Sequence, residues 1–123
     1  MSIRLVDHIN IATPRLEETR AFFVDVLGLT EGYRPDFAFP GYWLYAGERA
    51  VVHLQVSDGP VGPSRSSALN HFAFDVADLD ALAARLDAHG VAYRAVTVPG
   101  TEIRQAFFED PNGVRVELNQ SPD

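Results

Sequence analysis

Near the C-terminal end of the chain, apolar and polar side chains alternate along Val114-Arg115-Val116-Glu117-Leu118-Asn119. A period of two is typical of a β-strand with one apolar and one polar face. The preceding Asp110-Pro111-Asn112-Gly113 has the residue order of a tight turn. We therefore expect Glu117 in mid-strand, where a buried carboxylate needs an arginine, a proton or a metal as its partner.

Similar patterns predict the remaining elements. Strands are expected at residues 3–12, 50–56, 69–76, 91–98 and 102–109, with short strands and a loop in the aromatic-rich stretch 29–47. Apolar residues at helical spacing predict one helix from Leu16 to Leu27 and a second from Leu79 to Leu86. Gly28 and Gly90 follow these helices as stop signals, and Asp78 is the expected N-cap of the second.

The two halves of the chain repeat each other. Asp7-His8-Ile9-Asn10-Ile11 aligns with Asn70-His71-Phe72-Ala73-Phe74 at an offset of 63, and residues 43–53 align with 107–117 at an offset of 64. Each half then reads as strand, helix and about three strands. We predict an α+β fold of two tandem βαβββ modules, residues 1–57 and 67–121, joined by a Gly/Pro/Ser-rich linker at 58–66 within one compact domain.

Composition narrows the function classes. Ten arginines, no lysine and seventeen acidic residues give a net charge of −7, which repels nucleic acid. No stretch has the length of a membrane span, and the N-terminus lacks the pattern of a signal peptide. The absence of cysteine excludes thiolate metal sites and fits a reducing cytoplasm.

One polar side chain stands on the first strand and one on the last strand of each half, and these four are His8, His53, His71 and Glu117. Any one histidine alone is more simply read as a buried residue satisfied by a backbone carbonyl. Repeat-equivalent positions favour a joint site for one divalent transition metal, Fe, Ni, Co, Mn or Zn, because imidazole suits these ions better than Mg or Ca. The fourth histidine, His89, is interpreted as structural, since it lies in the last turn of the second helix.

With both βαβββ halves and the ending Asp110-Pro111-Asn112-Gly113 to Glu117-Leu118, the chain resembles the vicinal oxygen chelate superfamily, the glyoxalase/bleomycin resistance/dioxygenase group. The resemblance covers nearly the whole chain. It implies that the sheets of the two modules form an incomplete barrel around a metal, with ligands at His8, His53, His71 and Glu117. It also implies a homodimer and a small-molecule substrate that offers two adjacent oxygens to the metal.

The resemblance favours a glyoxalase-type lyase or isomerase with Glu117 as the catalytic base. The alternatives are an extradiol-type dioxygenase and a non-enzymatic protein that binds an antibiotic or aromatic molecule. Extradiol enzymes normally have a tyrosine where Phe107 stands and a histidine near residues 97–100, which this chain lacks. Glyoxalase I usually has Glu or Gln where this chain has His53, which removes one candidate base.

Further residues are candidates for the substrate pocket. Asn10 and Gln55 flank His8 and His53 on the polar faces of their strands, so they are placed to contact a ligand or to orient the imidazoles. The repeat suggests Trp43 and the resemblance suggests Phe107, with Gln105 on the same face as Phe107. Core packing is the alternative for both aromatic residues. Arg34, in the aromatic loop, is a candidate anion clamp or a solvated loop residue.

Overall fold

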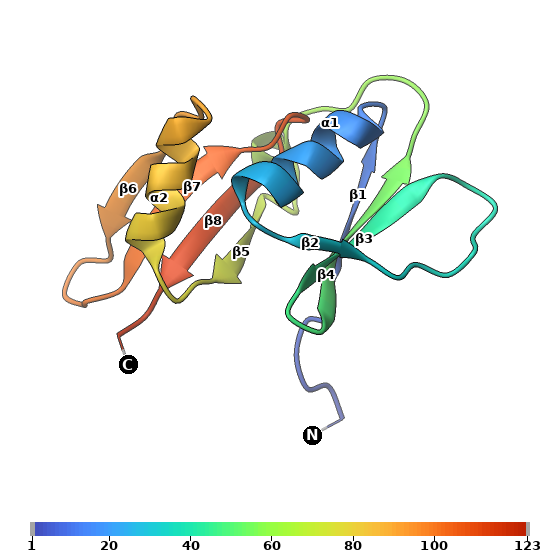
Figure 1. The fold of residues 1–123 in the computed structure, drawn as a ribbon. Helices are drawn as coiled ribbons and strands as arrows, with labels where there is room; N and C mark the ends of the chain where they lie inside the picture. The colour runs from blue at the N-terminus through green and yellow to red at the C-terminus, as the bar shows by residue number, and fades with distance from the viewer. Residues whose placement is uncertain (1, 123) are drawn as a thin grey trace. The chain divides into compact units, whose positions relative to one another are not determined.

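The computed structural model describes residues 2–122 and consists of two compact units, whose boundary lies between Val61 and Gly62. Each unit contains one four-stranded mixed sheet and one principal helix (Figure 1). The α+β class and the two-module, glyoxalase-like architecture expected from the sequence are confirmed. We call the units module 1 and module 2.

Module 1 contains four strands and one helix. Its strands are β1 (Ile9–Thr13), β2 (Thr30–Gly32), β3 (Gly41–Ala46) and β4 (Arg49–Val56), in the sheet order β1-β4-β3-β2. The helix α1 (Leu16–Ala21) continues into a π-helical turn, η1 (Phe22–Val26). The strands β1 and β4 are parallel, whereas the other neighbours are antiparallel.

Module 2 repeats this topology after a short 3₁₀ turn, η2 (Ser64–Ser66). Its elements are β5 (His71–Asp75), α2 (Leu79–Ala88), β6 (Arg94–Thr97), β7 (Arg104–Glu109) and β8 (Arg115–Gln120), and its sheet order is β5-β8-β7-β6. Asp78 is the N-cap of α2, as expected, because its Oδ1 accepts a hydrogen bond of 3.0 Å from the backbone N–H of Ala81.

Strand register preserves the sequence repeat. In module 1, His53 on β4 lies opposite Asn10 on β1 and Trp43 on β3. In module 2, Glu117 on β8 lies opposite Ala73 on β5 and Phe107 on β7. The two sheets therefore place residues separated by the offsets 63 and 64 at equivalent points.

Two expectations about module 1 are wrong. The first strand begins at Ile9 rather than at residue 3, so His8 is the residue immediately before β1, and Ile3 and Leu5 are exposed. Residues 3–5 have no strand to pair with, because β4 starts at Arg49; the pairing itself begins three residues into β4, between Ile9 and Val52. The helix starts at Leu16, as expected, but it is α-helical only to Ala21 and its C-terminal half widens into the π-helical turn.

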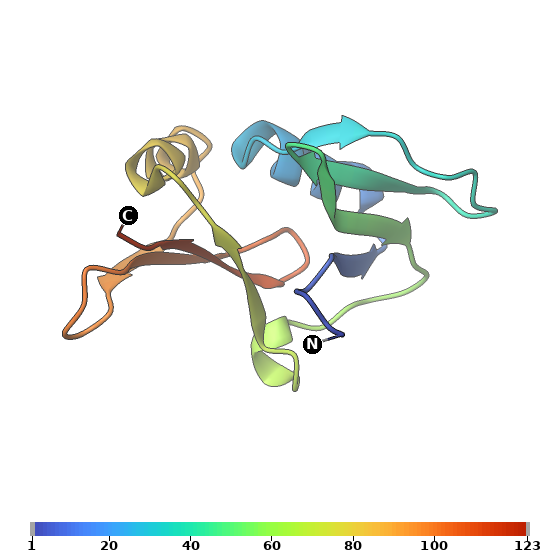
Figure 2. The same cartoon turned by 90° about the horizontal axis from the view of Figure 1, so that it is seen from below.

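Each helix covers one face of its own sheet. In module 2, α2 packs on β7 and β8, where its buried Leu79 and Leu86 meet the apolar face of the sheet (Figure 2). In module 1, the buried side chains of Phe23, Leu44 and Leu54 belong to the corresponding layer. Because side chains alternate along a strand, the polar residues of β4 and β8 project from the opposite face.

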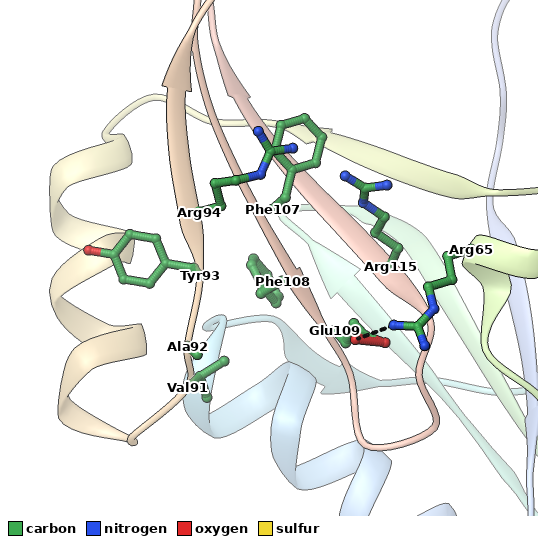
Figure 3. A pocket seen from close by; sticks show the side chains of 9 residues that line it. All are labelled: Arg65, Val91, Ala92, Tyr93, Arg94, Phe107, Phe108, Glu109 and Arg115. Atoms are coloured by element: carbon green, nitrogen blue, oxygen red, sulfur yellow. Dashed lines mark ion pairs between the residues drawn. The ribbon is translucent and has the colours of Figure 1, made fainter.

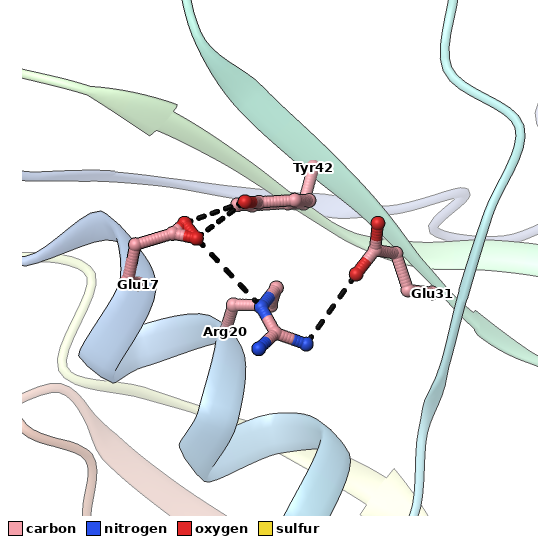
Figure 4. Close-up of polar contacts among 4 residues, drawn as sticks. All are labelled: Glu17, Arg20, Glu31 and Tyr42. Carbon is pink, nitrogen blue, oxygen red and sulfur yellow. Dashed lines mark hydrogen bonds and ion pairs between the residues drawn. The ribbon is translucent and has the colours of Figure 1, made fainter.

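A surface network ties α1 to the sheet of module 1. The Tyr42 hydroxyl on β3 donates to both carboxylate oxygens of Glu17, and Arg20 lies 3.4 Å from Glu31 of β2 (Figure 4). The hydrogen bond to Glu17, followed by burial, raises the pKa of Tyr42 above its usual value. These groups are solvent-exposed, so they orient the helix more than they stabilise it.

The turn Asp110–Gly113 is built as its sequence predicts. Oδ1 of Asp110 accepts from the backbone N–H groups of Asn112 and Val114, each at 2.8 Å, and Gly113 has a φ of 84°. Burial raises the pKa of Asp110 despite these hydrogen bonds. Ser64 of η2 fastens the turn, because its backbone N–H donates to the Gly113 carbonyl at 3.0 Å.

This packing predicts that Gly113→Ala destabilises the protein more than Gly100→Ala does. Both glycines have positive φ, which costs about 1 kcal/mol for alanine. A Cβ on Gly113 would also lie 3.2 Å from Cα of Pro63, whereas a Cβ on Gly100 meets nothing within 4 Å. Urea unfolding should give a loss of about 1 kcal/mol for Gly100→Ala and about 2 kcal/mol for Gly113→Ala. Equal losses would mean that Pro63 and η2 move away from the added Cβ at no cost in stability.

Candidate metal centre

The candidate site in module 2 is built on the polar face of β8 and its neighbours. Glu117, only 8% exposed, has its Oε1 at 3.2 Å from Nε2 of His71. Its Oε2 accepts a hydrogen bond of 3.1 Å from Nε2 of Gln105, which also donates to Asn119. Gln105 thus holds one oxygen of this carboxylate, and His71 lies beside the other.

Hydrogen bonding to Asn70 determines which nitrogen of His71 carries the proton. The amide Nδ2 of Asn70 donates to the Arg65 carbonyl at 3.1 Å, so its Oδ1 faces Nδ1 of His71 at 2.8 Å. Nδ1 is therefore the donor of the neutral imidazole, and Nε2 carries a lone pair. That lone pair and Oε1 of Glu117 face each other, an arrangement that needs a proton or a metal ion between them.

The candidate residues of module 1 form a stack of rings. The imidazoles of His8 and His53 are nearly parallel with centroids 3.7 Å apart, and Trp43 stacks on the other side of His53 at 4.1 Å. All three line a cavity of about 610 Å³ together with Phe37 and the short turn after β3. Aromatic stacking therefore holds both histidines on the open face of the sheet.

The imidazole of His8 is oriented in the same way as that of His71. Its Nδ1 lies 2.8 Å from Oδ2 of Asp7, the residue before it, and this hydrogen bond is the main cause of the lowered pKa of Asp7. Asp7 and Asn70 are equivalent in the repeat. In both modules the preceding side chain therefore holds Nδ1–H and leaves Nε2 as the nitrogen that faces a metal; in His71 this nitrogen also lies 3.2 Å from Glu117.

His53 is held differently. Its Nε2 lies 3.1 Å from the Ala50 carbonyl, so Nε2–H is the donor and Nδ1 is the remaining lone pair. Burial, followed by the proximity of His8, lowers the pKa of His53 and favours the neutral ring, the form in which imidazole binds metals. His53 thus remains either a ligand or a residue that supports His8.

The other pocket candidates lie beside these groups. The side chain of Asn10 donates to that of Gln55 at 3.1 Å, so this pair closes on itself in module 1. Phe107 meets the His71 ring edge-on at a centroid distance of 6.1 Å. Arg34 is not an open anion clamp, because its guanidinium packs on Phe37 and Phe39 and donates to the Phe39 carbonyl at 3.0 Å.

Each module by itself brings together two of the four proposed ligands. Within residues 2–122, the structure contains no group of three or more His, Cys, Asp or Glu side chains arranged to hold a metal. The four side chains nevertheless suit a transition metal, since Fe, Ni, Co, Mn and Zn prefer imidazole and carboxylate ligands. The orientation of His8 and His71, each held through Nδ1, agrees with that role.

Sequence reasoning missed the residues that orient the ligands. Asp7 and Asn70 stand directly before the first-strand histidines and align in the repeat, which was the available signal. It also missed Arg94 and Arg115, both of which pack against the ring of Phe107. The alternation along β8 had already placed Arg115 on the same face as Glu117, so the sequence provided partial evidence for the contact between Arg115 and Phe107.

Comparison with protein families identifies the class of protein to which the chain belongs. It is a member of the Glyoxalase/Bleomycin resistance protein/Dioxygenase superfamily, whose model matches residues 5–118. The resemblance found in the sequence is thereby confirmed. Among residues 2–122, no helix is long and apolar enough to cross a membrane.

Individual relatives span nearly the whole chain. It is 34% identical to the uncharacterized protein YaeR of Escherichia coli, over 96% of this chain and 97% of that protein. It is 29% identical to lactoylglutathione lyase of Salmonella typhimurium, over 94% of this chain and 92% of that enzyme.

Solved structures share the fold. A glyoxalase family protein from Bacillus anthracis matches with a TM-score of 0.83 at 25% identity, covering 99% of this chain and 98% of that one. A mutant of the fosfomycin resistance protein FosX from Listeria monocytogenes, complexed with Mn(II), matches with a TM-score of 0.76 at 20% identity, covering 98% and 94%. The family therefore includes proteins that bind a divalent metal, and this second likeness concerns the fold alone.

From the ring stack in module 1 we predict that the tryptophan fluorescence of chelator-treated protein changes with pH. The chain has one tryptophan, and protonation of the stacked His53 should quench it. Because the folded protein disfavours protonated His53, the midpoint should lie below the ordinary value of about 6.5. The neutral His53 therefore contributes fully to the stability of the fold above about pH 6.5. This contribution is lost as the pH falls through the lowered pKa of His53.

His53→Gln should abolish this transition, while His89→Gln, at the exposed end of α2, should leave it unchanged. A midpoint at or above 6.5 would contradict the burial argument. Intrinsic emission recorded from pH 8 to pH 4, with circular dichroism as a check on folding, provides the measurement.

Proposed function

We propose that this protein is a small metal-dependent enzyme that binds two adjacent oxygens of its substrate on one divalent transition metal. The observation that carries the proposal is the pairing of His71 and Glu117. Asn70 fixes the lone pair of His71 Nε2 toward Oε1 of Glu117, only 3.2 Å away. A divalent cation satisfies both groups, and the equivalent orientation of His8 by Asp7 supplies a second imidazole of the same kind.

The proposed ligands are His8, His53, His71 and Glu117. A divalent metal bound by these groups supplies Lewis acidity to two neighbouring substrate oxygens, such as those of a 2-hydroxy ketone or a 2-keto acid derivative. Glu117 is the proposed catalytic base, because it is the only carboxylate in the set. Gln105 donates to its Oε2 and so keeps the carboxylate aimed along the open face of the sheet.

The proposed reaction class is a glyoxalase-type lyase or isomerase. Similarity to lactoylglutathione lyase over nearly the full length of both chains supports this order of preference. Extradiol ring cleavage is second, because Phe107 cannot supply the proton that a tyrosine would, and its ring meets His71 only through an edge contact.

The candidate function outside the enzymes is a protein that binds and sequesters an aromatic or antibiotic molecule without catalysis. The observation that favours it is the aromatic wall of module 1, where Phe37 stacks on Phe39 at 5.4 Å and lies 6.3 Å from Trp43. Such a wall suits a planar ligand. The ordered pair His71–Glu117 has no use in that function, so we place the sequestering protein after the two enzyme classes.

The metal assignment predicts the metal content of single variants. Glu117→Ala should reduce metal to below about a tenth of the wild-type occupancy, and His8→Ala or His71→Ala should lose most of it, since each removes a ligand. His53→Ala should be milder, with an affinity loss of about 10- to 100-fold. Elemental analysis of protein purified without added metal, and again after metal loading, measures each value.

The matched control is His89→Ala, which removes the fourth histidine and should leave metal content unchanged. Glu117→Gln repeats the test with nearly the same side-chain volume, in case Glu117→Ala does not fold. Equal metal content in wild type and both Glu117 variants would refute the site and leave His71 as a protonated partner. Sedimentation of the same samples tests the proposed homodimer; a micromolar monomer that retains metal would contradict a shared site.

The reaction class can be tested separately on metal-loaded protein. Turnover of α-ketoaldehyde–thiol adducts is expected, and Glu117→Gln should lower kcat by about 10²- to 10⁴-fold, the usual contribution of a general base. Catechols are assayed in parallel, with and without air. Oxygen consumption with a catechol would put ring cleavage first, whereas no turnover with any metal would favour the binding protein.

A further inference from the structure

Three arginines surround a cavity of about 530 Å³ on the open face of module 2 (Figure 3). Arg94 belongs to β6, Arg115 to β8, and Arg65 to η2. Tyr93, Phe107 and Glu109 complete much of the wall. We call Arg65, Arg94 and Arg115 the arginine cluster.

Two members of the arginine cluster pack on the same ring. The guanidinium carbons of Arg94 and Arg115 each lie 5.0 Å from the centroid of Phe107, and therefore within about 10 Å of one another. Strand register explains this contact, because Arg94 lies opposite Phe107 across β6 and β7. Stacking against an aromatic face immobilises a guanidinium and leaves its N–H edges free to donate.

Neither arginine of this pair forms an ion pair within the described part of the chain, although Glu109 lies opposite Arg115 across β7 and β8. Among residues 2–122, neither Arg94 nor Arg115 has a carboxylate within ion-pair distance, whereas Arg65 lies 3.9 Å from Glu109. Holding two like charges on one ring is unfavourable without a counter-ion. Two arginines without an ion pair on one ring, in a chain of net charge −7, are therefore available to bind an anion.

We propose that the arginine cluster is an anion subsite that binds one phosphate or carboxylate group of a ligand. Arg94 and Arg115 donate to the oxyanion, and Arg65 stands at the rim, partly neutralised by Glu109. The N–H groups of guanidinium form charge-assisted and often paired hydrogen bonds to both kinds of oxyanion.

The subsite adjoins the candidate metal ligands. Arg115 lies opposite His71 across β8 and β5, and Phe107 lies opposite Glu117 across β7 and β8. If the proposed function is correct, on which this step rests, the substrate is an organic anion. Its phosphate or carboxylate is then separated by several bonds from the two oxygens that reach the metal.

The experiment measures anion binding to metal-free protein by titration calorimetry in chelator-containing buffer. The probes are inorganic phosphate, succinate and 2-phosphoglycolate, so that the tightest arm identifies the preferred oxyanion. Saturable binding is expected, weakened about 10-fold or more in Arg94→Gln and in Arg115→Gln. Arg85→Gln, on the exposed surface of α2, makes the same charge change and should bind like wild type.

Phe107→Leu provides a second variant, because it removes the stacking platform without changing any charge and should also weaken binding. The proposal is overturned if no probe binds saturably, or if Arg85→Gln weakens binding as much as Arg94→Gln. Metal content of the same variants separates the two hypotheses. Anion binding in a protein that never holds metal would refute only the proposed function, and metal without anion binding would refute only the subsite.

Discussion

The candidate site depends on one interaction, the hydrogen bond by which Asn70 fixes the tautomer of His71. With Nδ1–H engaged, Nε2 lies 3.2 Å from Oε1 of a buried carboxylate, and the two atoms need a proton or a metal between them. Glu117 cannot relax away easily, because Gln105 holds its other oxygen. The region is therefore organised for a positive species, and the choice between a proton and a metal defines the chemistry of the protein.

The fold provides this arrangement because each sheet has only one principal helix. One face of each sheet is closed by apolar packing, as by Leu86 of α2, while the other is left for polar side chains. A strand between an apolar face and a polar face alternates apolar and polar side chains. This is why β8 carries Glu117 between the fully buried Val116 and Leu118. Duplication of the module repeats the pattern at His53, between Val52 and Leu54.

Alternation and the repeat made much of the fold and the residues of the candidate site predictable from sequence. The boundaries of the first strand were not, because β1 is defined by its pairing with β4, a partner distant in sequence, and that pairing begins only at Ile9 and Val52. The π-helical turn after Ala21 had no signal in the apolar spacing. The repeat pointed to Asp7 and Asn70, but which ring nitrogen each one holds required the structure, since a tautomer is determined by hydrogen-bond partners and not by residue order.

The charge distribution joins these features. A chain with net charge −7 repels anions at long range, but over distances of a few ångströms the local groups dominate, because solvent and salt screen the rest. On the open face of module 2, the acidic Glu117 lies opposite Phe107, the residue on whose ring Arg94 and Arg115 pack. A cation at the carboxylate and an anion at the arginines would each be stabilised by the other. The same face is thus suited to a ligand that carries both a chelating end and an anionic end. A metal alone would neutralise Glu117 but leave the positive charges of Arg94 and Arg115 without a partner.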